Sequence, residues 1–269
     1  MSSSCLLVVI TAALYGMPVD VLPGSEPLSI DPIQIGENRY FPASKTVEAD
    51  GYFNVVGGFI EYLACLPGTK SHETLIGLDG DPAQLQAALM LLNIKESRSP
   101  ESEMDLGPLD GGDRLVISLR FGVKDAEGRD LTRTIRVERC IVNAPMEREM
   151  VRCGFAFTAS GFLVLDPPPG APEGAKPAEE FMARVTGELI SLSHRPWAIL
   201  DNPLALPYPD GDYFAYTDVL PQHRRDDPPP VTLLFRRALP GDIDPGAIRM
   251  ELPPRGETGQ NETADPEEG

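Results

Sequence analysis

Hydrophobic and polar residues alternate most regularly over residues 115–123, where every odd position is apolar. A period of two is typical of a strand that buries one face. Residues 124–129 (KDAEGR) have the composition of a turn, and the apolar residues Leu131, Ile135 and Val137 continue the pattern on a return strand. The segment is therefore predicted to form a β-hairpin.

A helical period follows Asp81. Asp81 is a good N-cap residue, Pro82 suits the first helical position, and Gln84 completes a capping box. The helix is predicted to run from Pro82 to about Leu92 and to lie in the core, because apolar side chains leave little of its surface for solvent. Its apolar face consists of Leu85, Ala88, Leu89 and Leu92, widened by Ala87, Met90 and Leu91.

Strand-like runs make up most of the remaining chain. They occupy residues 33–56, 58–65, 150–165, 181–200 and 231–239. Since one helix stands among many strands, the predicted fold class is α+β, with mostly antiparallel strands and one core helix, about residues 82–92, packed on the sheet.

Two segments interrupt this pattern and are predicted to be loop insertions in a domain that spans residues 31–239. Residues 95–113 are charged and rich in Ser, Gly and Pro, without periodicity. Residues 166–177 hold five prolines, so they cannot form a helix or a central strand. The acidic residues 240–269 cannot bury enough apolar surface to offset their ordering entropy, and they are predicted to be a disordered tail.

The first residues carry an apolar run of signal-peptide length. Residues 5–15 (CLLVVITAALY) are followed by Gly16 and a polar stretch, so residues 1–16 are a candidate signal segment. The protein is accordingly expected to be exported, to the periplasm or the cell surface. A signal peptide usually begins with positive charge, whereas the first basic residue here is Arg39. A buried N-terminal strand over residues 6–11 is the alternative.

Acidic residues outnumber basic ones by 41 to 23, which gives a net charge of −18. Such a chain repels a phosphate backbone and an anionic membrane surface, so no nucleic-acid partner is expected. No apolar run approaches the roughly 20 residues that cross a bilayer, and no membrane-spanning segment is expected. The expected partner is an extracytoplasmic ligand or protein.

The cysteines lack the spacing typical of metal binding. Once a signal segment is removed, Cys65, Cys140 and Cys153 remain, with no CxxC pair, so no iron–sulfur cluster or structural zinc is expected. Cys140 and Cys153 lie in one strand–turn–strand region and are able to pair in an oxidising compartment. The alternative is that all three are small buried hydrophobic residues.

Polar side chains are densest in residues 68–74 (GTKSHET), between a strand and the helix. Lys70, His72 and Glu73 are able to supply an acid/base pair with an electrostatic stabiliser, which makes them candidate catalytic residues. Neighbouring residues on a strand or helix point apart, so His72 and Glu73 are not expected to share a target. The alternative is a polar loop whose side chains serve the backbone, and in that case His72 is at least partly buried.

No complete catalytic motif is present, since the sequence lacks GxSxG, HExxH, GxGxxG and P-loop patterns. Several strings of Asp and Gly are similar to calcium loops, but none completes the EF-hand pattern. Asp210 and Asp212 are the best calcium candidates, because calcium is plentiful outside cells. Calcium is the one cofactor candidate.

Four segments together resemble the YdjY-domain family, whose members are exported bacterial proteins without an established activity. They are residues 59–75 (FIEYLACLPGTKSHETL), 87–92 (AALMLL), 157–162 (FTASGF) and 198–203 (AILDNP). The resemblance covers roughly residues 33–239 and implies an exported domain. Some relatives accompany iron–sulfur modules, which requires cysteine spacing that this chain lacks. The matching polar positions are Glu61, Lys70, His72, Glu73, Asp201 and Asn202, of which Glu61, Asp201 and Asn202 are the candidate ligand-binding residues.

Two functions are consistent with these features. The first is an exported binding or interaction domain for an unknown ligand, which the abundant loops, the acidity and the lack of a complete catalytic motif favour. The second is a hydrolase or lyase in which His72 acts as acid/base and Lys70 stabilises an oxyanion. Glu73 or Asp201 would orient the histidine. Convergence of Lys70, His72 and Asp201 in a cleft would favour the enzyme.

Overall fold

The chain divides into two units, residues 1–31 and 32–269, and the fold belongs to the second. The candidate signal segment, residues 1–16, lies outside the described residues, as do residues 248–269 of the expected tail. A computed structural model describes residues 31–54, 58–102, 108–143, 148–167, 169–170, 172, 174, 176–204, 214–216, 219–221 and 227–247.

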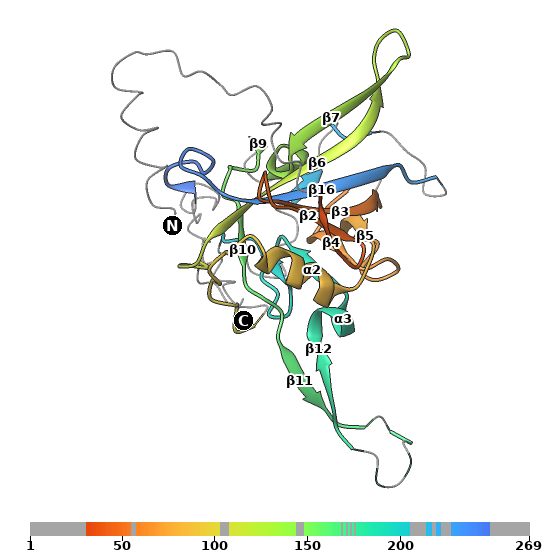
Figure 1. Ribbon diagram of the computed structural model, residues 1–269, viewed down its shortest axis with the longest axis vertical. Coiled ribbons are helices and arrows are strands. Elements are labelled where there is room, and N and C mark those ends of the chain that lie inside the picture. Colours follow the sequence, from red (N-terminus) through yellow and green to blue (C-terminus); the bar gives the residue numbers. More distant parts are fainter. Residues whose placement is uncertain are drawn as a thin grey trace, which may run out of the picture. The chain divides into compact units, whose positions relative to one another are not determined.

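Eight strands close into a β-barrel (Figure 1). Neighbouring strands are antiparallel except for two parallel pairs, β13 with β14 and β4 with β5. The ring closes where β5 pairs with β3. Around the barrel the order is β3 (Thr46–Phe53), β16 (Pro230–Arg237), β6 (Arg114–Lys124), β10 (Phe155–Phe157), β14 (Leu200–Asp201), β13 (Glu188–Ser191), β4 (Tyr62–Cys65) and β5 (Thr74–Leu78).

The predicted α+β class is wrong, because the sheet of this mostly β fold closes on itself instead of offering an open face to a core helix. Alternation of apolar residues identifies strands one at a time, whereas closure depends on pairing between distant segments. Strand β3 pairs with β5 on one side and with β16 on the other, and no single stretch of sequence carries that information. Closure leaves the barrel strands without free edges.

Further strands extend the sheet beyond the barrel. Strands β1 (Ile33–Ile35) and β2 (Asn38–Phe41) form a hairpin that pairs with β3. Strand β7 (Asp130–Arg136) pairs with β6, which confirms the predicted hairpin. Leu131 is nevertheless 51% exposed, because this end of the hairpin extends past the barrel (Figure 1). A second sheet contains β15 (Phe214–Tyr216), β8 (Ile141–Asn143) and β9 (Arg148–Glu149), and the short helix η1 (Val137–Cys140) precedes β8.

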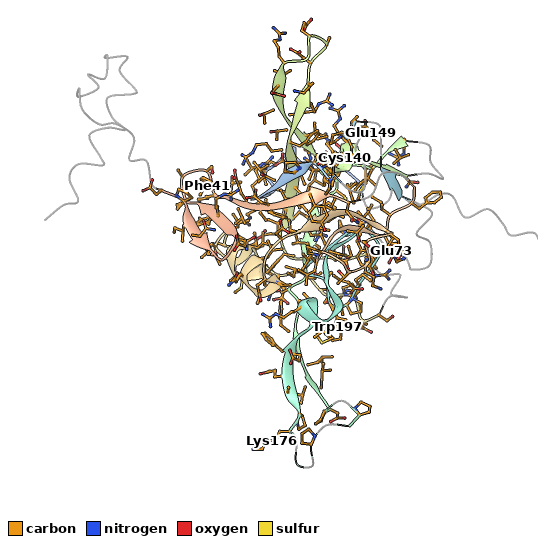
Figure 2. All side chains as sticks on the ribbon, turned by 90° about the vertical axis from the view of Figure 1, so that its right-hand side faces the viewer. Phe41, Glu73, Cys140, Glu149, Lys176 and Trp197 are labelled. Atoms are coloured by element: carbon orange, nitrogen blue, oxygen red, sulfur yellow. The ribbon has the colours of Figure 1, made fainter. Side chains whose placement is uncertain are left out.

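Two strands form a ribbon of their own, which we call the β11–β12 arm. It consists of β11 (Phe162–Leu165) and β12 (Ala178–Phe181), and the short helix α3 (Met182–Thr186) follows it. Residues 166–177, predicted as an insertion, connect the two strands. Lys176 marks the far end of the arm in Figure 2.

Helix α2 (Pro82–Met90) begins where the capping signal predicted it. The Asp81 carboxylate accepts a hydrogen bond of 2.7 Å from the Ala83 N–H, and the helix lies against β1, β2 and β3. Leu85, Ala88 and Leu89 are buried, but Met90 and Leu91 are exposed, so the expectation that little of the helix faces solvent is wrong. No helix in the described part of the chain is long and apolar enough to cross a membrane.

Two segments predicted to lie outside regular structure fall partly within the described residues. The described residues of the 95–113 loop form no strand or helix. The Lys95 N–H donates to the Asp113 carboxylate at 2.7 Å, and this hydrogen bond joins the two ends of the loop. Residues 240–247 of the expected tail lie within the described part of the chain, and there Asp242 and Asp244 pair with Arg236 and Arg152. These ion pairs hold residues 241–247 against the barrel.

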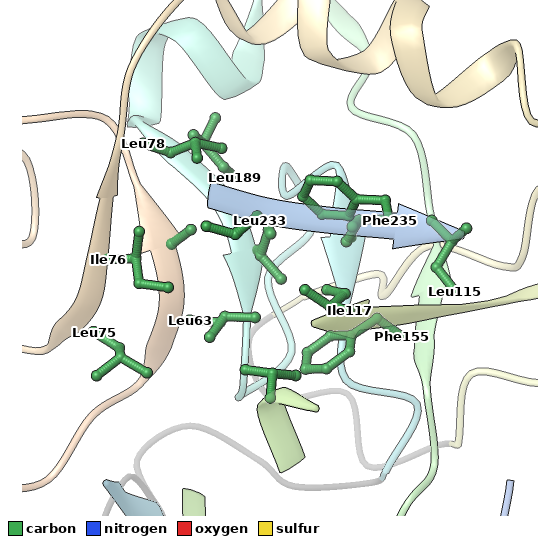
Figure 3. Packing of buried hydrophobic residues seen from close by; sticks show 14 of the residues in the cluster. Leu63, Leu75, Ile76, Leu78, Leu115, Ile117, Phe155, Leu189, Leu233 and Phe235 are labelled. Atoms are coloured by element: carbon green, nitrogen blue, oxygen red, sulfur yellow. The ribbon is translucent and has the colours of Figure 1, made fainter. Parts of the chain in front are cut away.

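The core fills the barrel with large apolar side chains from strands on every side. Figure 3 shows Leu63, Ile76, Ile117, Leu189 and Phe235 gathered there, and all of them are buried. Each such side chain contributes about 1.5–3 kcal/mol on burial.

None of the three cysteines in the described part of the chain forms a disulfide. Cys65, Cys140 and Cys153 are all buried, so they follow the hydrophobic alternative and Cys140 is not paired with Cys153. Burial raises the pKa of the Cys65 thiol to about 12 and that of the Cys140 thiol to about 12.

Candidate functional site

The polar loop predicted from the sequence connects β4 to β5 as a series of tight turns. The Glu73 N–H donates to the Lys70 carbonyl at 3.1 Å, and the Thr74 hydroxyl donates to the same carbonyl at 2.6 Å. The Asn54 side-chain amide donates to the carbonyls of Ser71 and Thr74 at 2.6 and 2.9 Å. These hydrogen bonds fix the turns of the loop, and none of them involves a charged side chain.

His72 is not buried, which contradicts the expectation of at least partial burial. Its side chain is 78% exposed, with Nε2 at 3.5 Å from the Glu73 carboxylate. The histidine was expected to provide hydrogen-bond partners for the loop backbone. The Glu73 N–H and the side chains of Thr74 and Asn54 provide them instead. The side chains of His72 and Glu73 lie next to each other, because the two residues lie in a turn and not in a strand or helix.

Four of the predicted polar residues converge at this loop, which we call the loop cluster: Glu61, Lys70, His72 and Glu73. The Glu61 N–H donates to the Glu73 carbonyl at 2.9 Å, and the Lys70 ammonium lies 5.9 Å from the centre of the Tyr62 ring. Partial burial raises the pKa of the Glu61 carboxyl, the Glu73 carboxylate raises it further, and Arg195 and Lys70 oppose both effects. The cluster therefore contains a carboxyl that holds its proton more tightly than an ordinary Glu.

A buried network continues inward from the loop cluster. Arg195, whose side chain is 2% exposed, donates to the Glu61 carboxylate and to the Tyr62 hydroxyl, both at 2.5 Å. Tyr62 in turn donates to Glu188 at 2.8 Å, and Arg195 also lies 5.0 Å from the Tyr62 ring. Burial first, and then the Glu188 carboxylate, raise the pKa of Tyr62, so this phenol stays neutral. These contacts connect β4, β13 and the chain that follows β13.

Asp201 and Asn202 lie deeper and are fully buried. The Asp201 carboxylate accepts from the Arg195 N–H at 2.9 Å and lies 3.5 Å from the His194 ring. Burial raises the pKa of Asp201, and His194 opposes that effect. The Asn202 side chain donates to the Leu192 carbonyl at 2.8 Å and accepts from the Leu204 N–H at 3.1 Å. Both residues hold the backbone that carries Arg195, and they do not reach the exposed loop cluster.

Sequence reasoning missed four members of this network. Tyr62, Glu188, His194 and Arg195 lie in runs read as apolar strand segments. A signal was present, since a charged residue inside such a run is rarely buried without a partner. Glu188 and Arg195 in one strand-like run were therefore candidates for mutual pairing.

The largest of the described cavities lies elsewhere, at the end of β16. It has a volume of about 700 Å³, and we call it the β16 groove. Leu91 and Leu239 provide exposed apolar walls, Leu239 being 64% exposed. In the described part of the chain, no residue of the loop cluster lines this cavity or the three others described. The groove is also lined by Tyr40, Lys45, Arg236 and Arg237.

Three cationic side chains line the β16 groove, and two of them are paired with carboxylates. Arg236 binds the Asp242 carboxylate at 2.6 Å, and Arg237 binds Asp113 at 2.7 Å. Lys45 is exposed and forms no ion pair with any other described residue. The arrangement offers an uncompensated ammonium beside apolar walls.

Metal binding has no support in the described residues, which contain no group of three or more His, Cys, Asp or Glu side chains able to hold an ion. The calcium candidates Asp210 and Asp212 lie outside those residues. No protein-family model, curated protein or solved structure matches the chain. The resemblance to the YdjY-domain family stays a prediction.

Proposed function

We propose that the chain is a binding domain whose β16 groove takes an amphipathic anion, meaning an acidic group carried on an apolar body. The observation that carries this proposal is the cavity of about 700 Å³ that combines exposed leucines with Lys45, Arg236 and Arg237. Binding sites for small ligands are commonly apolar clefts of about 300–1,000 Å³ with a few placed polar groups. The proposal includes an exported location, which rests on the apolar run of residues 5–15 and on the resemblance to exported proteins.

Charge supports this choice of ligand. The chain has a net charge of −18 and repels anions at long range, so an anion binds only where cationic side chains gather. The β16 groove is such a place. An apolar body on the ligand would cover Leu91 and Leu239, and each Å² of apolar area removed from water contributes about 25 cal/mol. A purely polar anion would gain only the charge contacts, which are worth little at an exposed site.

The test is a fluorescence titration of the full chain with anilinonaphthalene sulfonate, an aromatic anion whose emission rises in apolar surroundings. We expect saturable binding that Lys45→Glu and Leu239→Asp each weaken about tenfold, since each removes or repels one part of the probe. The matched control is Ile33→Asp, because Ile33 is an exposed apolar residue of β1 that does not line the groove. Binding that is unchanged by both groove substitutions would overturn the proposal, as would equal affinity for uncharged phenylnaphthylamine.

A second candidate function is acid–base catalysis at the loop cluster, which the raised pKa of Glu61 beside Glu73 favours. A carboxyl of this kind is able to act as a general acid, with Lys70 or Arg195 stabilising developing negative charge. The test is turnover of aryl esters and aryl glycosides. We expect Glu61→Gln to abolish any such turnover and Lys45→Glu to leave it unchanged. Turnover that survives Glu61→Gln would eliminate this candidate.

A further inference from the structure

The β11–β12 arm is a ribbon built from two strands that pair only with each other in the described part of the chain. In its register Leu163 faces Glu180 and Val164 faces Glu179. The root of the arm is fixed, because the Ser160 N–H donates to Gln86 of α2 at 2.8 Å and the Phe162 ring packs 5.1 Å from that of Phe181. Figures 1 and 2 show the ribbon extending away from the barrel.

The arm exposes three consecutive apolar residues: Phe162, Leu163 and Val164, the last being 68% exposed. Because successive residues of a strand point to opposite faces, both faces of the ribbon carry apolar surface. Exposed apolar patches and open strand edges are usually covered or protected in proteins that work alone. The anchored root and the exposed strand together indicate that the arm is a surface for binding another protein surface.

The chemistry of the arm matches that of the β16 groove. The arm presents an apolar strand, β11, next to the carboxylates of Glu179 and Glu180 on β12. The groove presents exposed leucines next to Lys45, Arg236 and Arg237. Within one chain the two surfaces do not cover each other, since Val164 and Leu239 are both largely exposed.

We propose that the β11–β12 arm of one copy of the chain docks in the β16 groove of a second copy. This inference rests on the proposed function of the groove and supplies its ligand: the acidic groups are Glu179 and Glu180, and the apolar body is the β11 strand. If both copies exchange arms, the result is a closed dimer with two identical contacts. Two small contacts formed together bind more tightly than one, because the translational and rotational entropy of association is lost only once.

The experiment is sedimentation of the full chain over about 1 to 100 μM, a range that detects micromolar association. We expect association that Val164→Asp in the arm and Leu239→Asp in the groove each weaken at least tenfold, because both residues lie at the centre of the contact. Leu131→Asp is the matched control, since Leu131 is a similarly exposed strand residue outside both surfaces and should leave association unchanged.

A charge exchange tests the pairing of the two surfaces without placing a new charge on an apolar contact. Glu179→Lys and Lys45→Glu should each weaken self-association, whereas a mixture of the two variants should form a mixed dimer. In that dimer the Glu179→Lys arm enters the Lys45→Glu groove. A chain that stays monomeric at every concentration overturns the inference, as does a mixture that associates no better than either variant alone. If the monomer still binds anilinonaphthalene sulfonate in the groove, the proposed function stands and only this inference fails; if that probe is not bound there, the proposed function fails too.

Discussion

Replacing the buried Arg195 with Met should strongly destabilise the fold. The substitution keeps most of the side-chain volume but removes the donors that bind Glu61 and Tyr62, both at 2.5 Å. Breaking a buried ion pair from one side costs about 3–5 kcal/mol, because the remaining charge is left without compensation. For a domain of about 150–250 residues this corresponds to a fall in Tm of roughly 6–20 °C.

The assay is urea unfolding followed by circular dichroism at several pH values. At neutral pH we expect the full loss. The loss should shrink as the pH falls through the pKa of Glu61, which burial and Glu73 raise above the ordinary value of 4.5, because a protonated Glu61 no longer needs a cation. Arg129→Met is the control: Arg129 is 72% exposed, so water screens its ion pair with Asp125 and the substitution should change stability little. A loss below about 1 kcal/mol for Arg195→Met, or one that does not depend on pH, would refute the reasoning.

Three further predictions concern single side chains. Arg39 holds the pKa of Asp50 below its usual value, so this pair stabilises the fold above about pH 4 and the stabilisation is lost as the pH falls through the folded pKa. Asp50→Asn should therefore make urea unfolding less dependent on pH between about 2 and 5, and an unchanged dependence would contradict this. Asp81→Ala should cost about 0.5–2 kcal/mol in thermal unfolding, because the N-cap of α2 is lost, and no change would show that the cap is redundant. His72→Ala should change stability by less than about 0.5 kcal/mol, since the ring is exposed, and a larger loss in the same assay would restore a structural role for this histidine.

Local structure could be predicted from the sequence where the signal lies within a few residues. The capping residues Asp81 and Pro82 predicted the start of α2, and strict alternation predicted the β6–β7 hairpin. Closure of the barrel could not be predicted, because it depends on the pairing of strands such as β3 and β5, which β4 separates in the sequence. The surplus of apolar residues at the end of α2 was read as burial. In the structure Leu91 instead forms a wall of the β16 groove.

The candidate site was predicted in part. The loop cluster brings together Glu61, Lys70, His72 and Glu73, all named from the sequence, because the loop between β4 and β5 folds back on its own strand. The burial of Asp201 could not be foreseen, since its position beside His194 depends on the parallel pairing of β13 and β14. The β16 groove was missed because its walls come from segments separated by more than a hundred residues in sequence, with Lys45 at one end and Leu239 at the other.

The most direct test of the central claim is to map the bound anion by amide chemical shifts in an isotope-labelled full chain. Titration with anilinonaphthalene sulfonate should shift the amides of Lys45, Asn93 and Leu239, which line the β16 groove. The chemical shifts of the Glu61 and Glu73 amides, in the loop cluster, should not change. Shifts that concentrate at Glu61 and Glu73 and spare the groove would contradict the account and assign the binding site to the loop cluster.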